Sequence, residues 1–168
     1  SNTKAGKVIL LDIYKSMLEK KIYKAGENGY LNYLLFSYIL TNALHKKELK
    51  WAENFIDKYI GEIDPLYQEN MMHYSKAHLY FEMKDFNKSL EHIIKVKADN
   101  FMFKHQTYKL TVENYYEVNE IEPLYYSMDN FKYYITKGNL REDWAKYYEN
   151  YLASVKELVK LKEGKEKD

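Results

Sequence analysis

Two apolar stripes of helical spacing occupy residues 72–97, and a short polar break separates them. Side chains three and four residues apart lie on one face of a helix. The stripes are made of Tyr74, Ala77, Tyr80 and Phe81 before the break and Leu90, Ile93 and Ile94 after it. Two stripes of this length predict two helices joined by a tight turn, which together form a helical hairpin.

The break at residues 83–87 has the residues that such a turn needs. The carboxylate of Asp85 can accept hydrogen bonds from the free amides at the start of the second helix. Phe86 follows as a wedge between the two helices. Ala77 and Ser89 are small, so they are placed where the two helices would approach closely.

The hairpin pattern recurs on both sides of this stretch. Leu49 precedes Phe86 by 37 residues, and Ile121 follows it by 35. We therefore predict hairpins at about 30–63, 67–98 and 101–136, flanked by helices at about 7–24 and 140–161. The third hairpin has Leu124 at the position of Ser89, so its helices are expected to splay or shift. The charged tail, residues 162–168, is expected to be frayed.

This pattern resembles the tetratricopeptide repeat, which has a period of about 34 residues. The matching small, aromatic and aliphatic positions are Ala77, Tyr80, Phe86, Ser89, Ile93 and Val96. The usual turn glycine is replaced by Lys84, and the closing proline is absent. Residues 51–56 and 77–86 also resemble the C-terminal part of long, uncharacterised bacterial helical-repeat proteins. The resemblance covers about residues 30–136 and implies an α-α solenoid, a short right-handed superhelix of stacked antiparallel hairpins.

The composition favours an all-α chain. Only two prolines and six glycines are present in 168 residues, and 46% of the residues are hydrophobic, which is enough for one domain with a core. We predict a single helical-repeat domain over 1–168. Because Ser1-Asn2 resembles a cloning scar, the sequence is compatible with a fragment of a longer protein.

The near-equal numbers of acidic and basic residues argue against a partner that binds through overall charge. The chain has 26 basic and 25 acidic residues, so no global field attracts nucleic acid or acidic membranes. Cysteine is absent, and no apolar run reaches the roughly 20 residues of a membrane-spanning helix. No signal peptide is recognisable at the N-terminus. We therefore expect no membrane insertion and a cytoplasmic location.

The polar residues form no recognisable catalytic or metal-binding motif. The sequence has no Gly-rich phosphate loop, His-Glu-x-x-His run or nucleophile elbow. His78 and Glu82 form an i,i+4 pair, and Trp51 and Trp144 fall on apolar stripes. We interpret the pair as a solvated helix face and the two tryptophans as core anchors. The prediction is no enzyme, no metal and no cofactor.

The predicted binding surface follows from the repeat resemblance, because such proteins commonly bind partners on the concave surface of their leading helices. The positions carried over one by one are Ser37, Thr41, His45, Tyr74, His78, Phe81, Glu82, Lys109, Glu113, Tyr116 and Glu117. Their charges are mixed, and only Lys109 could correspond to the basic set that grips acidic chaperone tails.

Two functions remain open from the sequence. The leading hypothesis is a non-catalytic protein-protein interaction scaffold that presents its concave helical surface to a peptide or a neighbouring domain. The alternative is a nucleic-acid-binding helical repeat, in which lysines contact phosphates and tyrosines stack on bases. The cluster at residues 20–24 allows this alternative, and the near-neutral charge disfavours it.

Overall fold

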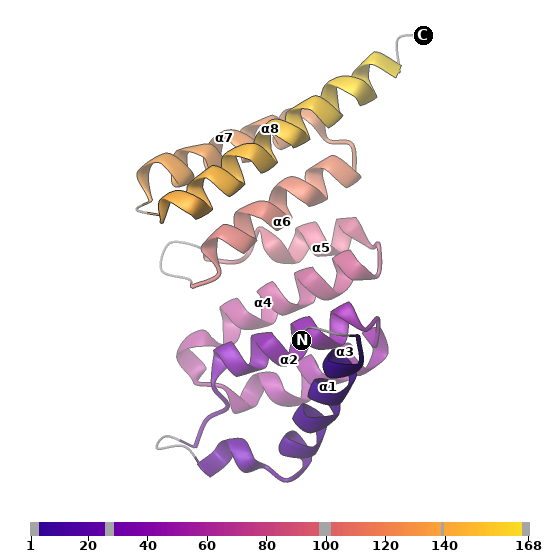
Figure 1. Ribbon diagram of the computed structural model, residues 1–168, viewed down its shortest axis with the longest axis vertical. Coiled ribbons are helices and arrows are strands. Elements are labelled where there is room, and N and C mark those ends of the chain that lie inside the picture. The colour runs from indigo at the N-terminus through magenta and orange to yellow at the C-terminus, as the bar shows by residue number, and fades with distance from the viewer. Residues whose placement is uncertain (1–3, 26–28, 98–101, 139, 166–168) are drawn as a thin grey trace. The chain divides into compact units, whose positions relative to one another are not determined.

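The computed structural model describes residues 4–25, 29–97, 102–138 and 140–165. These residues form eight α-helices and two short 3-10 helices, with no strand among them (Figure 1). The all-α prediction is confirmed. None of the helices in the described ranges is long and apolar enough to cross a membrane.

The chain forms two compact units, Ser1–Phe101 and Met102–Asp168. In unit 1, each helix packs against its neighbours along the chain, and α2 also packs against α4. Its elements are α1 (Lys4–Glu19), η1 (Ile22–Ala25), α2 (Tyr33–His45), α3 (Leu49–Tyr59), η2 (Ile60–Glu62), α4 (Pro65–Glu82) and α5 (Phe86–Ile93). The first two predicted hairpins are therefore present, as α2 with α3 and α4 with α5.

Unit 2 contains three helices. They are α6 (Lys104–Glu117), α7 (Ile121–Lys137) and α8 (Glu142–Lys165). The third predicted hairpin is α6 with α7, and α8 packs against α7. The predicted hairpin limits at 98 and 101 lie outside the described residues. The chain divides into two compact units, so a single superhelix and a single domain over the whole chain stay predictions.

The three hairpins share one turn geometry. Lys47, Lys84 and Asn119 have φ values of 60°, 62° and 62°, in the left-handed region. In each turn this residue donates its N–H to the carbonyl three residues back, and the next residue donates to the carbonyl five residues back, at 2.9–3.3 Å. These two hydrogen bonds satisfy carbonyl groups at the end of the leading helix. The turn thus recurs at the same 37- and 35-residue intervals as the sequence pattern.

Side chains also cap several helix starts. Asn32 accepts hydrogen bonds from the N–H groups of Leu34 and Leu35 at 2.9 and 3.3 Å. Asp85 accepts one from the N–H of Lys88 at 3.2 Å. These acceptors satisfy amides that have no partner inside the helix, and the predicted cap at Asp85 is confirmed.

The second hairpin has the predicted close crossing. Ala77 and Ser89 are fully buried. The Ser89 hydroxyl donates a hydrogen bond to the Ala77 carbonyl at 2.8 Å, which joins α5 directly to α4. The ring of Phe86 lies at the start of α5 with its centroid 5.3 Å from that of Phe81 on α4. Small side chains at this crossing therefore allow one helix to bond to the backbone of the other.

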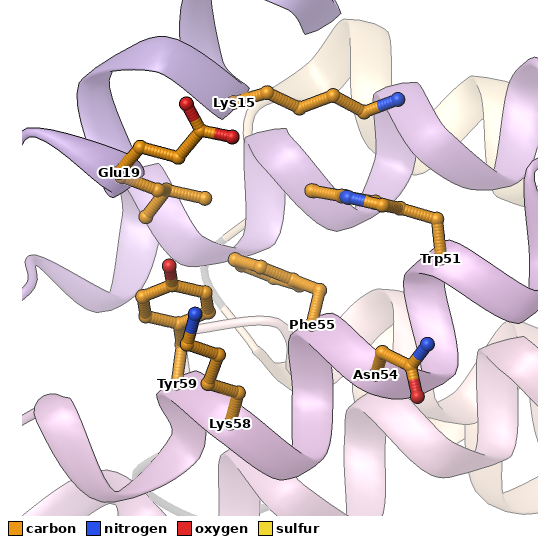
Figure 2. Close-up of a pocket in the computed structure, with 8 residues that line it drawn as sticks. Lys15, Glu19, Trp51, Asn54, Phe55, Lys58 and Tyr59 are labelled. Carbon is orange, nitrogen blue, oxygen red and sulfur yellow. The ribbon is translucent and has the colours of Figure 1, made fainter.

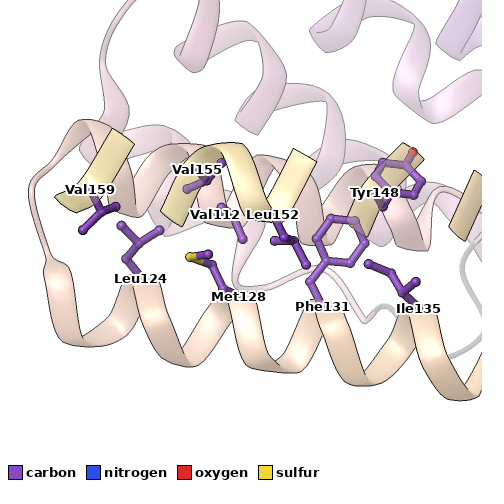
Figure 3. Packing of buried hydrophobic residues seen from close by; sticks show 9 residues of the cluster. All are labelled: Val112, Leu124, Met128, Phe131, Ile135, Tyr148, Leu152, Val155 and Val159. Carbon is purple, nitrogen blue, oxygen red and sulfur yellow. The ribbon is translucent and has the colours of Figure 1, made fainter. Parts of the chain in front are cut away.

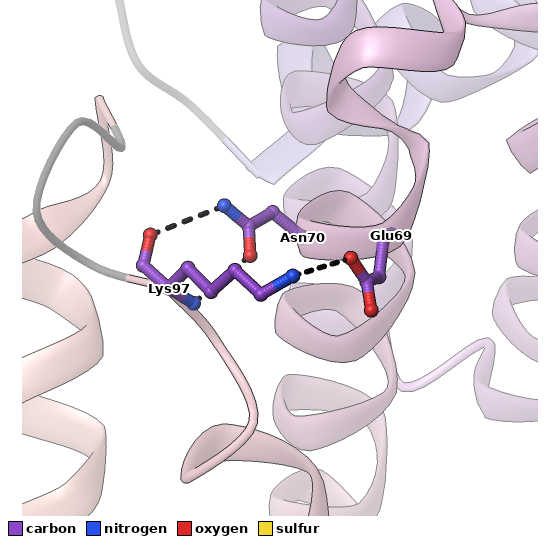
Figure 4. Close-up of polar contacts among 3 residues, drawn as sticks. All are labelled: Glu69, Asn70 and Lys97. Atoms are coloured by element: carbon purple, nitrogen blue, oxygen red, sulfur yellow. Dashed lines mark hydrogen bonds and ion pairs between the residues drawn. The ribbon is translucent and has the colours of Figure 1, made fainter.

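The segment that follows α5 is held on α4 by an asparagine. Asn70 donates through Nδ2 to the Lys97 carbonyl at 3.1 Å and accepts the Lys97 N–H at 2.9 Å (Figure 4). The Lys97 ammonium also pairs with Glu69 at 2.8 Å. This two-point backbone contact holds the last described residue of unit 1 against its longest helix.

The core of unit 2 lies between α6, α7 and α8 (Figure 3). It is built from Val112, Leu124, Met128, Phe131, Ile135, Tyr148, Leu152, Val155 and Val159. Phe131 lies among other rings, with centroids 5.5 Å from Tyr108 and 5.0 Å from Tyr148. The four α8 residues recur every three to four positions, so they form one buried face.

Several predicted details are wrong. The first helix was expected to continue to residue 24, but α1 ends at Glu19 and Lys21 adopts a φ of 51°. Ile22, which continues the apolar spacing of this helix, is consequently exposed. Trp144, predicted to be a core anchor, is also exposed, because α8 turns the face that includes Ala145 and Tyr148 toward the core. The tail is helical to Lys165, beyond the predicted end near 161.

Candidate functional site

In unit 1, the predicted binding residues on α2 and the first part of α4 differ in exposure. Thr41 and His45 are exposed on α2, as a surface contact requires. Ser37 and Tyr74 are buried, and the Tyr74 ring meets His78 edge-on with the centroids 4.5 Å apart. The ring of Tyr74 therefore belongs to the packed interior of unit 1.

The predicted residues at the end of α4 make contacts within unit 1. Phe81 is half-buried against Phe86. Glu82 forms an ion pair with Lys47 in the turn of the preceding hairpin. The ring contact joins the two helices of one hairpin and the ion pair links consecutive hairpins, so a partner that used either side chain would compete with the fold.

In unit 2, α8 covers much of the predicted binding face of α6. Lys109 pairs with Glu113, and its ammonium lies 5.3 Å from the ring centroid of Tyr151 on α8. Lys162 on α8 donates to the Tyr116 carbonyl at 3.2 Å and lies 4.8 Å from that ring's centroid. Glu117 is exposed. Three of the four predicted residues thus contact α8 or one another.

An aromatic row on α3 lines a pocket in unit 1 (Figure 2). The rings of Trp51, Phe55 and Tyr59 follow one another with centroids 5.3 and 5.4 Å apart. Lys15 lies 4.9 Å from the Trp51 ring and Lys58 lies 5.1 Å from the Tyr59 ring. The pocket measures about 210 Å³, below the roughly 300 Å³ typical of ligand sites. Its rings are already covered by the chain's own lysines.

A larger pocket lies in unit 2, between the first turns of α6 and α8. Its volume is about 460 Å³, within the usual range for ligand sites. The residues that line it are His105, Gln106, Asp143, Trp144, Tyr147 and Tyr148. Trp144 and Tyr147 are 41% and 59% exposed, so the pocket is open to solvent along α8. We call it the aromatic pocket.

Helical spacing brings its rings together. Trp144, Tyr147 and Tyr148 lie at positions i, i+3 and i+4 of α8, which share one face. His105 from α6 meets Trp144 edge-on at 5.0 Å between centroids and approaches Tyr148 at 5.6 Å. The Tyr147 and Tyr148 rings lie 5.0 Å apart, edge to face. Two helices therefore supply four rings to one pocket.

The aromatic pocket has a negative charge. Arg141 holds the Asp143 carboxylate through Nε at 3.1 Å and Nη2 at 2.5 Å, and this pairing lowers the pKa of Asp143. Burial lowers the pKa of His105, which favours the neutral ring. Burial also raises the pKa of Tyr148 to about 12, so the phenol keeps its proton. At neutral pH, Asp143 is the charged residue among those that line the pocket.

Two polar atoms of the lining residues have unused hydrogen-bonding capacity. Nε2 of His105 and Oε1 of Gln106 are buried, and neither has a hydrogen-bond partner among the described residues. Leaving such an atom unpaired costs roughly 1–3 kcal/mol. The amide oxygen of Gln106 accepts hydrogen bonds only, so a donor that reached it would relieve that cost.

The exposed apolar residues of α8 continue beyond the pocket. Leu158 and Leu161 are 49% and 63% exposed, and they lie 14 residues after Trp144 and Tyr147, respectively. Fourteen residues make almost four helical turns, so the two pairs lie on the same side of α8. We call Trp144, Tyr147, Leu158 and Leu161 the α8 face.

A third pocket, of about 410 Å³, lies between α7 and α8. Asp129 and Lys132 line it from α7, and Glu149 and Lys156 line it from α8. The charges of its two acidic and two basic residues cancel. This pocket therefore has no charge or ring arrangement that selects a ligand class.

The described parts of the chain contain few groupings of metal-binding side chains. No group of three or more His, Asp or Glu residues there could hold a metal ion. His73 on α4 and His92 on α5 do approach each other, with their Nδ1 atoms 3.0 Å apart. Sequence reasoning missed this pair, because the two histidines are 19 residues apart and only the hairpin brings them together.

Comparison with known proteins gives no match, whether to family models, to curated proteins or to solved structures. The resemblance to tetratricopeptide and bacterial helical-repeat proteins therefore stays a prediction.

Proposed function

We propose that this chain is a non-catalytic protein-interaction module whose unit 2 binds a partner protein along the α8 face. The observation that carries the proposal is the exposure of four large apolar side chains, between 41% and 63%, on one side of a single helix. Single exposed apolar residues are ordinary, whereas several of them on one side of a helix are typical of interaction surfaces.

The residue types of the α8 face support a protein partner. Trp and Tyr dominate the residues that carry most of the energy of protein interfaces. Trp144 and Tyr147 lie at one end of the face and Leu158 and Leu161 at the other. A segment of about five helical turns, laid along α8, would remove all four from water at a gain of about 25 cal/mol for each Å² of apolar surface buried.

Nucleic-acid binding, the alternative from the sequence, has weaker support. In the basic cluster at residues 20–24, Lys24 pairs with Glu62 at 2.9 Å and lies 6.0 Å from the Tyr23 ring centroid. Its charge and that ring are thus partly used within unit 1. Binding to single-stranded RNA that is submicromolar and falls steeply with salt would favour the alternative.

The experiment is a crosslinking capture with purified chain from an extract of its source cells. The site variant carries Leu158→Ser and Leu161→Ser, and a matched control carries Tyr126→Ser and Tyr133→Ser at exposed positions of α7. Wild type and control should retain the same partner proteins, and the site variant should lose them, while circular dichroism reports equal helix content. Retention of the same partners by both variants would refute the proposed surface.

A further inference from the structure

We infer that the aromatic pocket binds a basic side chain, a guanidinium or ammonium group, presented by the protein that unit 2 recognises. This inference deepens the proposed function and rests on it, because the pocket includes the Trp144 end of the α8 face. Three properties of the pocket support a cationic occupant: its rings, its charge and its hydrogen-bond acceptors.

The rings are suited to a cation. A positive group within about 6 Å of the face of Trp or Tyr is attracted by the ring's negative quadrupole, and Trp attracts it most strongly. Unit 2 already uses this contact three times, with Lys104 near Tyr134, Lys109 near Tyr151 and Lys162 near Tyr116. Among the described residues, no lysine or arginine lies over Trp144 or Tyr147. Those two exposed rings are left for a cation from another molecule.

The charge of the pocket selects the same ligand class. Asp143 contributes a carboxylate, and none of the residues that line the pocket is Lys or Arg. An anionic side chain would meet that carboxylate without a lining cation to bind it. Arg141 offsets part of the negative charge, but the Asp143 side chain is 63% exposed, so a second cation can approach its carboxylate from the solvent side.

The acceptors favour a ligand rich in N–H groups. Oε1 of Gln106 is buried without a partner, and a rotation of its side chain toward the pocket would let it accept from a ligand. Guanidinium has five N–H donors and ammonium has three. The volume of about 460 Å³ accommodates one such side chain, and the open side along α8 lets the partner's backbone continue toward Leu158.

The test uses free amino-acid derivatives, so it does not depend on knowing the partner. The isotope-labelled full chain is titrated with N-acetyl-arginine amide, N-acetyl-lysine amide and N-acetyl-citrulline amide. Citrulline is the matched control, because it has nearly the shape of arginine without the charge. The chain has two tryptophans, so the indole N–H of Trp144 reports on the pocket and that of Trp51 serves as an internal reference.

We expect the arginine and lysine probes to shift the Trp144 indole signal in a saturable manner while the Trp51 signal stays in place. Trp144→Ala should weaken binding by roughly 2- to 30-fold, as measured on the His105 ring signals. Asp143→Asn should also weaken it, and Tyr126→Ala should leave it unchanged. Equal binding of the citrulline probe, or no shift at Trp144, would overturn the inference.

The two proposals fail in different ways. If basic probes do not bind but the Leu158 and Leu161 variant still loses its partner, the inference about the pocket is wrong and the proposed function stands. If basic probes bind as expected but the leucine variant keeps its partner, the pocket assignment stands and the proposed α8 surface is wrong. Circular dichroism of Trp144→Ala and Asp143→Asn checks that the helices remain formed.

Discussion

Replacing Ala77 with leucine perturbs the helix crossing of the second hairpin. Ala77 and Ser89 are both fully buried, so the added carbon atoms find no open space beside α5. The Ser89 hydroxyl lies 2.8 Å from the Ala77 carbonyl, and a larger side chain at the crossing would separate these two atoms. The substitution therefore combines overpacking with the loss of a buried hydrogen bond.

The magnitude follows from these two effects. Overpacking a core position costs roughly 1–3 kcal/mol, and the net contribution of a lost hydrogen bond is about 1 kcal/mol. The expected loss in the free energy of unfolding is therefore about 2–4 kcal/mol. For a cooperative unit of 60–100 residues, each kcal/mol lowers the melting temperature by about 4–8 °C. A decrease of roughly 8–30 °C should result.

The assay follows unit 1 by itself. In a Trp144→Phe background, Trp51 is the remaining tryptophan, so its fluorescence reports thermal unfolding of unit 1. Lys50→Leu, at an exposed position of α3 in the same unit, is the control and should change stability by less than about 0.5 kcal/mol. An Ala77→Leu protein that melts within about 2 °C of its parent would refute the close crossing.

Three further predictions concern the same hairpin. Lys84→Gly should stabilise it by up to about 1 kcal/mol, because glycine adopts the left-handed φ of 62° without strain; Lys84→Val should shift the urea midpoint in the opposite direction. Asp85→Ala should cost about 0.5–2 kcal/mol through loss of the helix cap, and an unchanged urea midpoint would contradict the cap. Burial lowers the pKa of His73 and His92 from 6.5, so the folded state binds protons less readily than the unfolded state. The contribution of this pair to the free energy of unfolding should be fully present above pH 6.5 and should be lost as the pH drops below that value. A His92→Asn protein whose stability declines equally between pH 7.5 and 5 would exclude this pair as the cause.

The hairpins could be predicted from the sequence because their determinants are local. Asp85 caps the helix that begins one residue later, and Lys84 supplies the left-handed turn beside it. Ala77 and Ser89 lie 12 residues apart, within one hairpin. These determinants are the apolar spacing, the capping residue and the small side chains at the crossing. Each acts over a few helical turns, so it can be recognised in the sequence alone.

The end of α1 shows where periodicity misleads. Ile22 continues the apolar spacing of the first helix, yet it lies in a separate 3-10 helix after the left-handed Lys21. A spacing rule counts positions and does not detect a change of backbone conformation between them. Residues 7–25 contain no glycine or proline, so no local signal marked this break.

The candidate site depended on tertiary structure. The sequence places Trp144 on an apolar stripe of α8, and from this it was expected in the core. The structure places Tyr148 and Leu152 in the core and leaves Trp144 partly exposed beside His105, 39 residues earlier in the chain. Lys162 likewise meets Tyr116 across 46 residues. Helical periodicity decides which side chains share a face, whereas the helices that pack against α8 decide which of its apolar faces is buried and which is left for a partner.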